Sequence, residues 1–156
     1  MAGNLTALCV VAGSLARPLG GLVADRFGGV RSLAILYGVV AMLTFFVGQL
    51  PAVPWVTLSL FLMMAALGMG NGAVFQLVPQ RFQREIGVVT GVVGAAGGIG
   101  GFLLPFLFGV LKDLSGSYAA GFMLIGLTAF GCGCLVLYRQ RDWRRHWAGE
   151  EAGALI

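Results

Sequence analysis

The stretch LTALCVVAGSLARPLGGLVA, residues 5–24, carries a single charged side chain, that of Arg17. At ~1.5 Å rise per residue, about twenty helical residues cross the ~30 Å of hydrocarbon in a bilayer. Arg17 would then lie ~18 Å along the helix, where an arginine costs roughly 2.5–3.5 kcal/mol to insert. The stretch therefore predicts a membrane-spanning helix that holds a cation deep inside it.

We interpret Arg17 as an anion site, because an arginine at that depth must face a bundle interior or a watery cavity. Its planar guanidinium can bind a planar oxyanion through two parallel hydrogen bonds, which an ammonium group does less well. Pro18 lacks an N–H and leaves the carbonyl of Ser14 without its helical partner, so the helix is locally weak beside the cation. The alternative is an arginine that reaches the membrane surface or pairs with backbone carbonyls.

Four further apolar runs follow, at residues 32–50, 56–78, 87–111 and 118–138. Together with residues 5–24 they predict an all-α membrane protein of five transmembrane helices, bundled over residues 1–138. Only 10% of the 156 residues are charged, whereas a soluble domain carries about 25%. The net charge of +4 belongs to short segments between the apolar runs, which indicates a lipid bilayer and no nucleic acid as the partner.

The connections between the runs alternate in charge, and this predicts one orientation. Arginines follow the first, third and fifth runs, whereas the second connection is uncharged and the fourth balances one lysine against one aspartate. Because positive segments stay in the cytoplasm, we expect the N-terminus outside, the C-terminus inside, and a cytoplasmic tail over residues 139–156. The odd number of spans and the abrupt start at a span suggest an incomplete protein.

A charged turn after the first run is a candidate gating loop. Its residues are Gly21, Asp25, Arg26, Gly28 and Arg31. A carboxylate in such a turn can accept N–H bonds from the N-terminus of a neighbouring helix. The alternative is a positively charged loop that only sets the topology.

The third run ends in GMGNGAVFQLVPQRF, residues 68–82, where Asn71 is a polar side chain between two glycines. Phe75 lies four residues further and shares its helix face, whereas Gln76 does not. An aromatic ring can stack on a flat anion and exclude water, so Asn71 and Phe75 are candidate substrate-binding residues. Alternatively, Asn71 and Gln76 hydrogen-bond across helices and Phe75 belongs to the core.

The fourth run, GVVTGVVGAAGGIGGFLLP at residues 87–105, carries a glycine stripe on one helix face. The stripe consists of Gly87, Gly91, Gly94, Gly98 and Gly101. Such a stripe predicts close helix packing. Its bare backbone could also let a substrate lie against the helix and let neighbouring helices slide.

Several kinds of chemistry are missing from the sequence. No Asp, Glu or His lies in the middle of a predicted span, and proton-coupled transport usually needs such a group. A transporter of this kind would favour exchange or facilitated movement of an anion over proton symport. Without a His/Cys cluster, a phosphate loop or a nucleophile–base pair, we expect no enzyme activity, no catalytic residue, no metal and no cofactor.

Three motifs in this order carry a family resemblance. They are Ala16-Arg17-Pro18-Leu19-Gly20-Gly21, then Gly70-Asn71-Gly72 with Phe75, then the glycine-rich run 91–101 with Phe102 and Pro105. Together they resemble the nitrate/nitrite porter family of the major facilitator superfamily, and the last resembles its second nitrate signature. Gly21-x-x-x-Asp25-Arg26-x-Gly28 resembles the superfamily's cytoplasmic loop motif, except that Gly29 stands where a basic residue is usual.

The resemblance implies a partial C-terminal half, spans eight to twelve of a twelve-span fold, in a bacterial inner membrane. Arg17 would be one of two substrate-binding arginines, and Phe75 part of an aromatic sandwich around nitrate, nitrite or a similar small anion. Asn71 and the glycines Gly94, Gly97 and Gly98 would line or pack the pathway. The missing N-terminal half would be the partner that supplies the second arginine.

Two alternative functions stay open at this point. The chain could be a truncated, transport-inactive membrane segment, or a partner whose glycine stripe (Gly87, Gly91 and Gly101 included) serves only assembly. It could also belong to a major facilitator transporter of another small anion.

Overall fold

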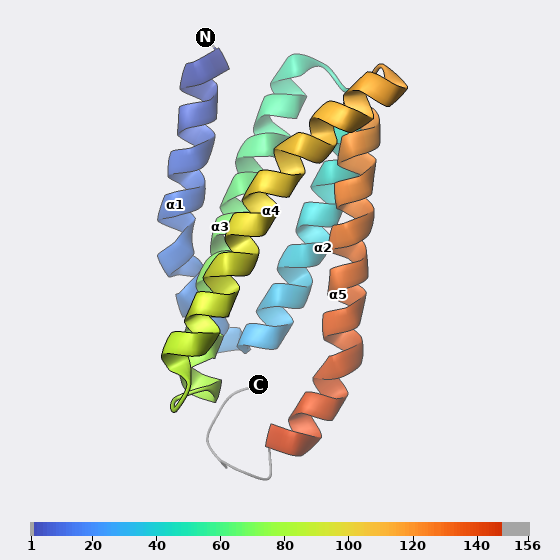
Figure 1. Cartoon of the computed structure of the whole chain (residues 1–156). Coiled ribbons are helices and arrows are strands. Elements are labelled where there is room, and N and C mark those ends of the chain that lie inside the picture. Colours follow the sequence, from blue (N-terminus) through green and yellow to red (C-terminus); the bar gives the residue numbers. More distant parts are fainter. Residues whose placement is uncertain (1, 148–156) are drawn as a thin grey trace.

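The computed structural model describes the backbone of residues 2–147 and the side chains of residues 3–140, and this part of the chain is helical throughout, without strands (Figure 1). The helices are α1 (Ala2–Phe27), α2 (Gly29–Gly48), α3 (Val53–Arg81), α4 (Ile86–Ser115) and α5 (Ala119–Trp147). All five contain a segment long and apolar enough to cross a membrane. The prediction of an all-α membrane fold with five spans is confirmed.

The helices end where local chemistry stops them rather than where the apolar runs end. α4 continues past residue 111 to Ser115, because its first left-handed residue is Gly116, with φ 71°, whose N–H bonds the Lys112 carbonyl at 2.8 Å. α5 continues to Trp147, so the first part of the predicted tail is helical. Residues 148–156 of that tail lie outside the described residues.

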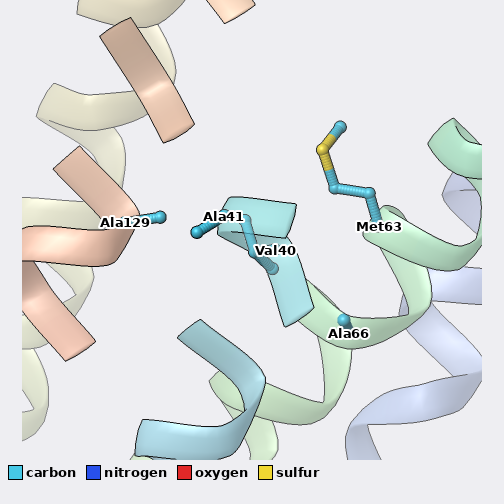
Figure 2. Packing of buried hydrophobic residues seen from close by; sticks show 5 residues of the cluster. All are labelled: Val40, Ala41, Met63, Ala66 and Ala129. Carbon is cyan, nitrogen blue, oxygen red and sulfur yellow. The ribbon is translucent and has the colours of Figure 1, made fainter. Parts of the chain in front are cut away.

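The core of the bundle centres on α2, which packs between α3 and α5. Val40 and Ala41 of α2 form a buried cluster with Met63 and Ala66 of α3 and Ala129 of α5. Figure 2 shows the methyl groups of Ala41 and Ala129 pointing toward one another across the α2–α5 contact. Small side chains on both helices let the two backbones approach closely.

Glycines bring α1 and α3 into backbone contact. A Cβ on Gly68 would collide with the carbonyl oxygen of Gly13, and a Cβ on Gly20 would collide with the backbone of Met69. Only glycine permits such an approach, since any side chain would force the two backbones apart. Close packing through glycines was predicted for the fourth run, and this contact between α1 and α3 was not predicted.

Helix α4 is the least covered part of the bundle. It has no buried residue, and it meets α3 near one end and α5 near the other, as its diagonal course shows (Figure 1). Near its C-terminal end, Phe108 packs edge-on against Phe122 of α5, with ring centroids 5.1 Å apart. No atom lies within 4 Å of a Cβ added at any of the glycines predicted to pack or to line a pathway, namely Gly87, Gly91, Gly94, Gly97, Gly98 and Gly101. No described residue packs against these glycines, and their role in helix packing stays a prediction.

Candidate functional site

Arg17 lies at the edge of the α1 face that packs on α3. The buried residues of α1 recur at helical spacing, with Ala16, Gly20 and Ala24 on one face, and Arg17 directly follows the first of these. The carbonyl oxygen of Arg17 contacts Gly72 of α3 so closely that a Cβ on Gly72 would collide with it. The position of the Arg17 backbone is therefore set by α3.

The same contact brings two predicted site segments together. Asn71 immediately precedes Gly72, and Phe75 follows it by less than one helical turn, so both lie on α3 near the level of Arg17. Arg17 and Asn71 are exposed, and Phe75 is 40% exposed. Phe75 is therefore not a core residue of the described chain, and this face of α1 and α3 remains uncovered by it.

The charge of Arg17 is not neutralised within the part of the chain that the structure describes. No hydrogen bond or ion pair engages its guanidinium there, and the nearest acidic residue on α1, Asp25, lies two helical turns further and accepts hydrogen bonds from α3. A guanidinium without a carboxylate partner keeps its full capacity to bind an anion.

The predicted gating loop is a one-residue connection. α1 ends at Phe27 and α2 begins at Gly29, and the intervening Gly28 has φ 90° and ψ 129°. Side-chain-bearing residues rarely adopt this backbone conformation. Arg26 and Arg31 are exposed beside the connection, and Gly21 is half-buried about two turns earlier.

Asp25 of this segment is engaged by α3. Its Oδ1 accepts hydrogen bonds from the side-chain amides of Gln76 and of Gln80, the latter at 3.5 Å. We expected a carboxylate here to accept N–H bonds from a helix N-terminus, and the donors are instead two glutamines in the last two turns of α3. Gln80 was missed, although its spacing of four from Gln76 places both on one face.

The glycine stripe of α4 is not brought to Arg17 by this chain. Among the described residues, α1 and α4 have no close approach, and α4 meets α3 over a short stretch only. Gly94, Gly97 and Gly98 therefore stay predicted site residues. The residues with described side chains also contain no group of three or more His, Cys, Asp or Glu that could hold a metal ion.

Five long apolar helices with largely exposed apolar side chains define an integral, multi-pass membrane protein. The sequence profile of the Major Facilitator Superfamily matches residues 1–154, and the chain belongs to this superfamily of membrane transporters.

The chain is similar to bacterial proteins named for nitrite extrusion and nitrate transport. The chain is 32% identical to the nitrite extrusion protein of Bacillus subtilis (strain 168) over 147 aligned residues. These residues make up 93% of this chain and 37% of that protein. It is 29% identical to the probable nitrate transporter NarT of Staphylococcus aureus (strain Newman) over 154 aligned residues. These make up 99% of this chain and 38% of that protein. The chain thus spans less than two fifths of the length of these relatives. No solved structure matches the chain significantly.

Proposed function

We propose that the chain is the C-terminal part of a nitrate/nitrite transporter that moves a small oxyanion across a bacterial inner membrane by alternating access. The observation that supports the proposal is the contact of the Arg17 backbone carbonyl with Gly72, the α3 residue that follows Asn71 and precedes Phe75 by less than one turn, while the side chains of Arg17, Asn71 and Phe75 are all exposed. The relatives named for nitrite extrusion and nitrate transport support this choice of anion.

Each residue has a distinct role in the proposal. The guanidinium of Arg17 supplies charge and two parallel hydrogen bonds to a planar oxyanion. The ring of Phe75 stacks on the flat anion, and the amide of Asn71 donates a further hydrogen bond. The other half of the site comes from the N-terminal part of the transporter, because midplane sites in such folds form between two repeats.

Exchange or facilitated uptake is the mode that we propose. The predicted spans contain no carboxylate or imidazole at mid-depth, where a proton relay would require one. Asp25 lies near the end of α1, about two helical turns from Arg17, and its carboxylate accepts hydrogen bonds from two glutamines. It is therefore not placed to relay protons at the depth of Arg17.

Uptake of labelled nitrate into proteoliposomes tests the proposal, with the chain present together with the remaining part of its transporter. Arg17→Lys keeps the charge but loses the fork of donors, and we expect nitrate uptake to fall roughly 10- to 100-fold, as for the loss of one charged hydrogen bond. Arg84→Lys, an exposed arginine in the α3–α4 connection, is the matched control and should transport normally. Wild-type uptake by the Arg17→Lys protein would disprove the proposed role.

Two further measurements separate the alternatives. Competition of nitrate uptake by nitrite, formate and chloride identifies the preferred anion, and a preference for a non-planar anion would reassign the substrate. Detection of the native product with an antibody against residues 139–156 gives its mass. A band at 16.3 kDa, rather than two to three times that mass, would favour a transport-inactive segment or a helix-packing partner.

A further inference from the structure

Because Gly72 has no side chain, the backbone of α3 lies directly against the backbone of α1 at Arg17. A Cβ on Gly72 would collide with the carbonyl oxygen of Arg17 and would stand 3.1 Å from the amide nitrogen of Gly21. These two atoms belong to one turn of α1, since the N–H of Gly21 is placed to bond the carbonyl of Arg17. Gly72 therefore lies directly on the helical turn that begins with the proposed anion-binding residue.

The neighbouring contacts hold the same turn in place. One turn before it, Gly13 meets the Met64 carbonyl oxygen, which would lie 3.0 Å from an added Cβ, and within the turn itself Gly20 meets Met69. The same separation of 55 residues relates Asp25 to Gln80 and Arg17 to Gly72, so α1 and α3 keep one parallel register over two turns. A displacement at Gly72 cannot be absorbed by a slip of one helix past the other without breaking these contacts.

Pro18 makes this turn more dependent on α3. Because proline has no N–H, the carbonyl of Ser14 has no partner within α1, and the helix is weaker just at Arg17. A helix that is locally weak takes its shape from what it packs against. At Arg17 that surface is the bare backbone of Gly72.

We propose that Gly72 is a positioning residue for Arg17: its missing Cβ fixes the distance between α1 and α3 and hence the place of the guanidinium in the anion site. The inference rests on the proposed function of Arg17 and adds a residue that does not touch the anion. Replacing Gly72 by alanine would force the backbones apart by about 2 Å to restore an ordinary contact of 3.5–4.0 Å. Two parallel hydrogen bonds from a planar fork do not tolerate such a shift.

The test compares Gly72→Ala with Gly38→Ala, in proteoliposomes that contain the chain together with the rest of its transporter. Gly38 is a helical glycine of α2 with open space where a Cβ would stand, so its replacement repeats the chemistry without the collision. We expect Gly72→Ala to raise the KM for nitrate roughly 10-fold or more while the maximal rate per inserted molecule stays within a few-fold of wild type. Gly38→Ala should leave both values unchanged.

A structural measurement accompanies transport and does not depend on it. Nitroxide labels at the exposed residues Leu15 of α1 and Leu67 of α3, in a protein whose native cysteines are replaced by serine, report the spacing of the two helices. Pulsed electron paramagnetic resonance should show a longer mean distance in Gly72→Ala and no change in Gly38→Ala. A loss of rate without a change in KM would assign Gly72 a merely structural role and overturn the inference.

A milder variant keeps the proposal testable if Gly72→Ala does not accumulate in the membrane. Gly13→Ala creates a contact of 3.0 Å that needs a shift of only a few tenths of an ångström one turn before Arg17. It should accumulate and raise the KM roughly 2- to 5-fold. A wild-type KM in whichever of the two variants accumulates would overturn the inference.

The outcomes also separate this inference from the proposed function. If the unsubstituted protein moves no anion, the proposed function fails and the role assigned to Gly72 fails with it, even when the labels move apart. If the unsubstituted protein transports nitrate and Gly72→Ala transports it with the same KM, only the role of Gly72 is wrong.

Discussion

The carboxylate of Asp25 on α1 accepts hydrogen bonds from the side-chain amide of Gln76 on α3, and Gln80 reaches the same oxygen at 3.5 Å. An acidic residue that stands among the arginines of the α1–α2 and α3–α4 connections is thus engaged by uncharged amides. The amide oxygen of Gln76 is buried without a partner, because its NH₂ group must face the carboxylate. Together with the contact of Arg17 on Gly72, this ties α1 and α3 at two levels.

Removing the carboxylate should loosen this tie. Asp25→Ala leaves both glutamine amides without their acceptor, and we expect the free energy of unfolding to fall by about 1 kcal/mol, a value reduced by the exposure of the site. Thermal unfolding in detergent, followed by circular dichroism, gives the change. Asp113→Ala, an exposed carboxylate of α4 that changes the net charge equally, is the control. Equal losses in both variants would mean that charge, and not the hydrogen bonds, matters.

The one-residue connection between α1 and α2 should not tolerate a side chain. Gly28→Ala places a Cβ on a backbone with φ 90° and ψ 129°, and we expect a loss of about 1–3 kcal/mol in unfolding free energy. Gly38→Ala in the middle of α2 should instead be neutral or slightly stabilising, because alanine is the better helix former. A Gly28→Ala protein as stable as wild type would show that the turn can adopt another conformation.

The contact of α4 with α5 should depend on one aromatic pair. Phe108 meets Phe122 edge-on at 5.1 Å and also lies against Gly121, so Phe108→Ala should release this end of α4. The release is measured as a longer mean distance between nitroxide labels at the exposed residues Val110 of α4 and Leu124 of α5, in a protein without its native cysteines. Phe106→Ala is the matched control, since Phe106 stacks on Phe102 of its own helix. An unchanged distance in Phe108→Ala would show that the rest of the contact suffices.

The orientation predicted from charge can be measured directly. In a protein without its native cysteines, a cysteine at Ser117 in the α4–α5 connection should react with a membrane-impermeant maleimide from outside the cell. A cysteine at Arg84, in the connection at the other end of α4, should react only after the membrane is permeabilised. The reverse pattern of labelling would mean that the N-terminus lies inside.

The sequence alone predicted the number and type of helices, because twenty-residue apolar runs and short charged connections are local signals. Helix ends were less accurate, since a helix continues past its apolar part until a residue such as Gly116 stops it. The resemblance of the motifs pointed to the superfamily that the profile match established.

The pairing of helices was not predictable from these signals. The glycine stripe of α4 has the spacing of a packing surface, yet within the described chain the glycines in close contact with the backbone of another helix are Gly13, Gly20, Gly68 and Gly72. A spacing shows that a helix can be approached but does not identify which helix approaches it. A hydrogen bond from Gln76 to another helix was one of the two alternatives, but its partner, Asp25, could not be identified for the same reason, since the two residues are 51 positions apart.

The lack of any buried residue on α4 bears on how the chain survives in a cell. The helices α1, α2, α3 and α5 are held in place by packing against one another. Helix α4 has little such packing and is rich in glycine, which weakens a helix interior by roughly 0.5–1 kcal/mol relative to alanine. Membrane proteases and chaperones act on segments that open most readily. We therefore expect the half-life of the protein after synthesis to be governed by how soon another surface covers α4.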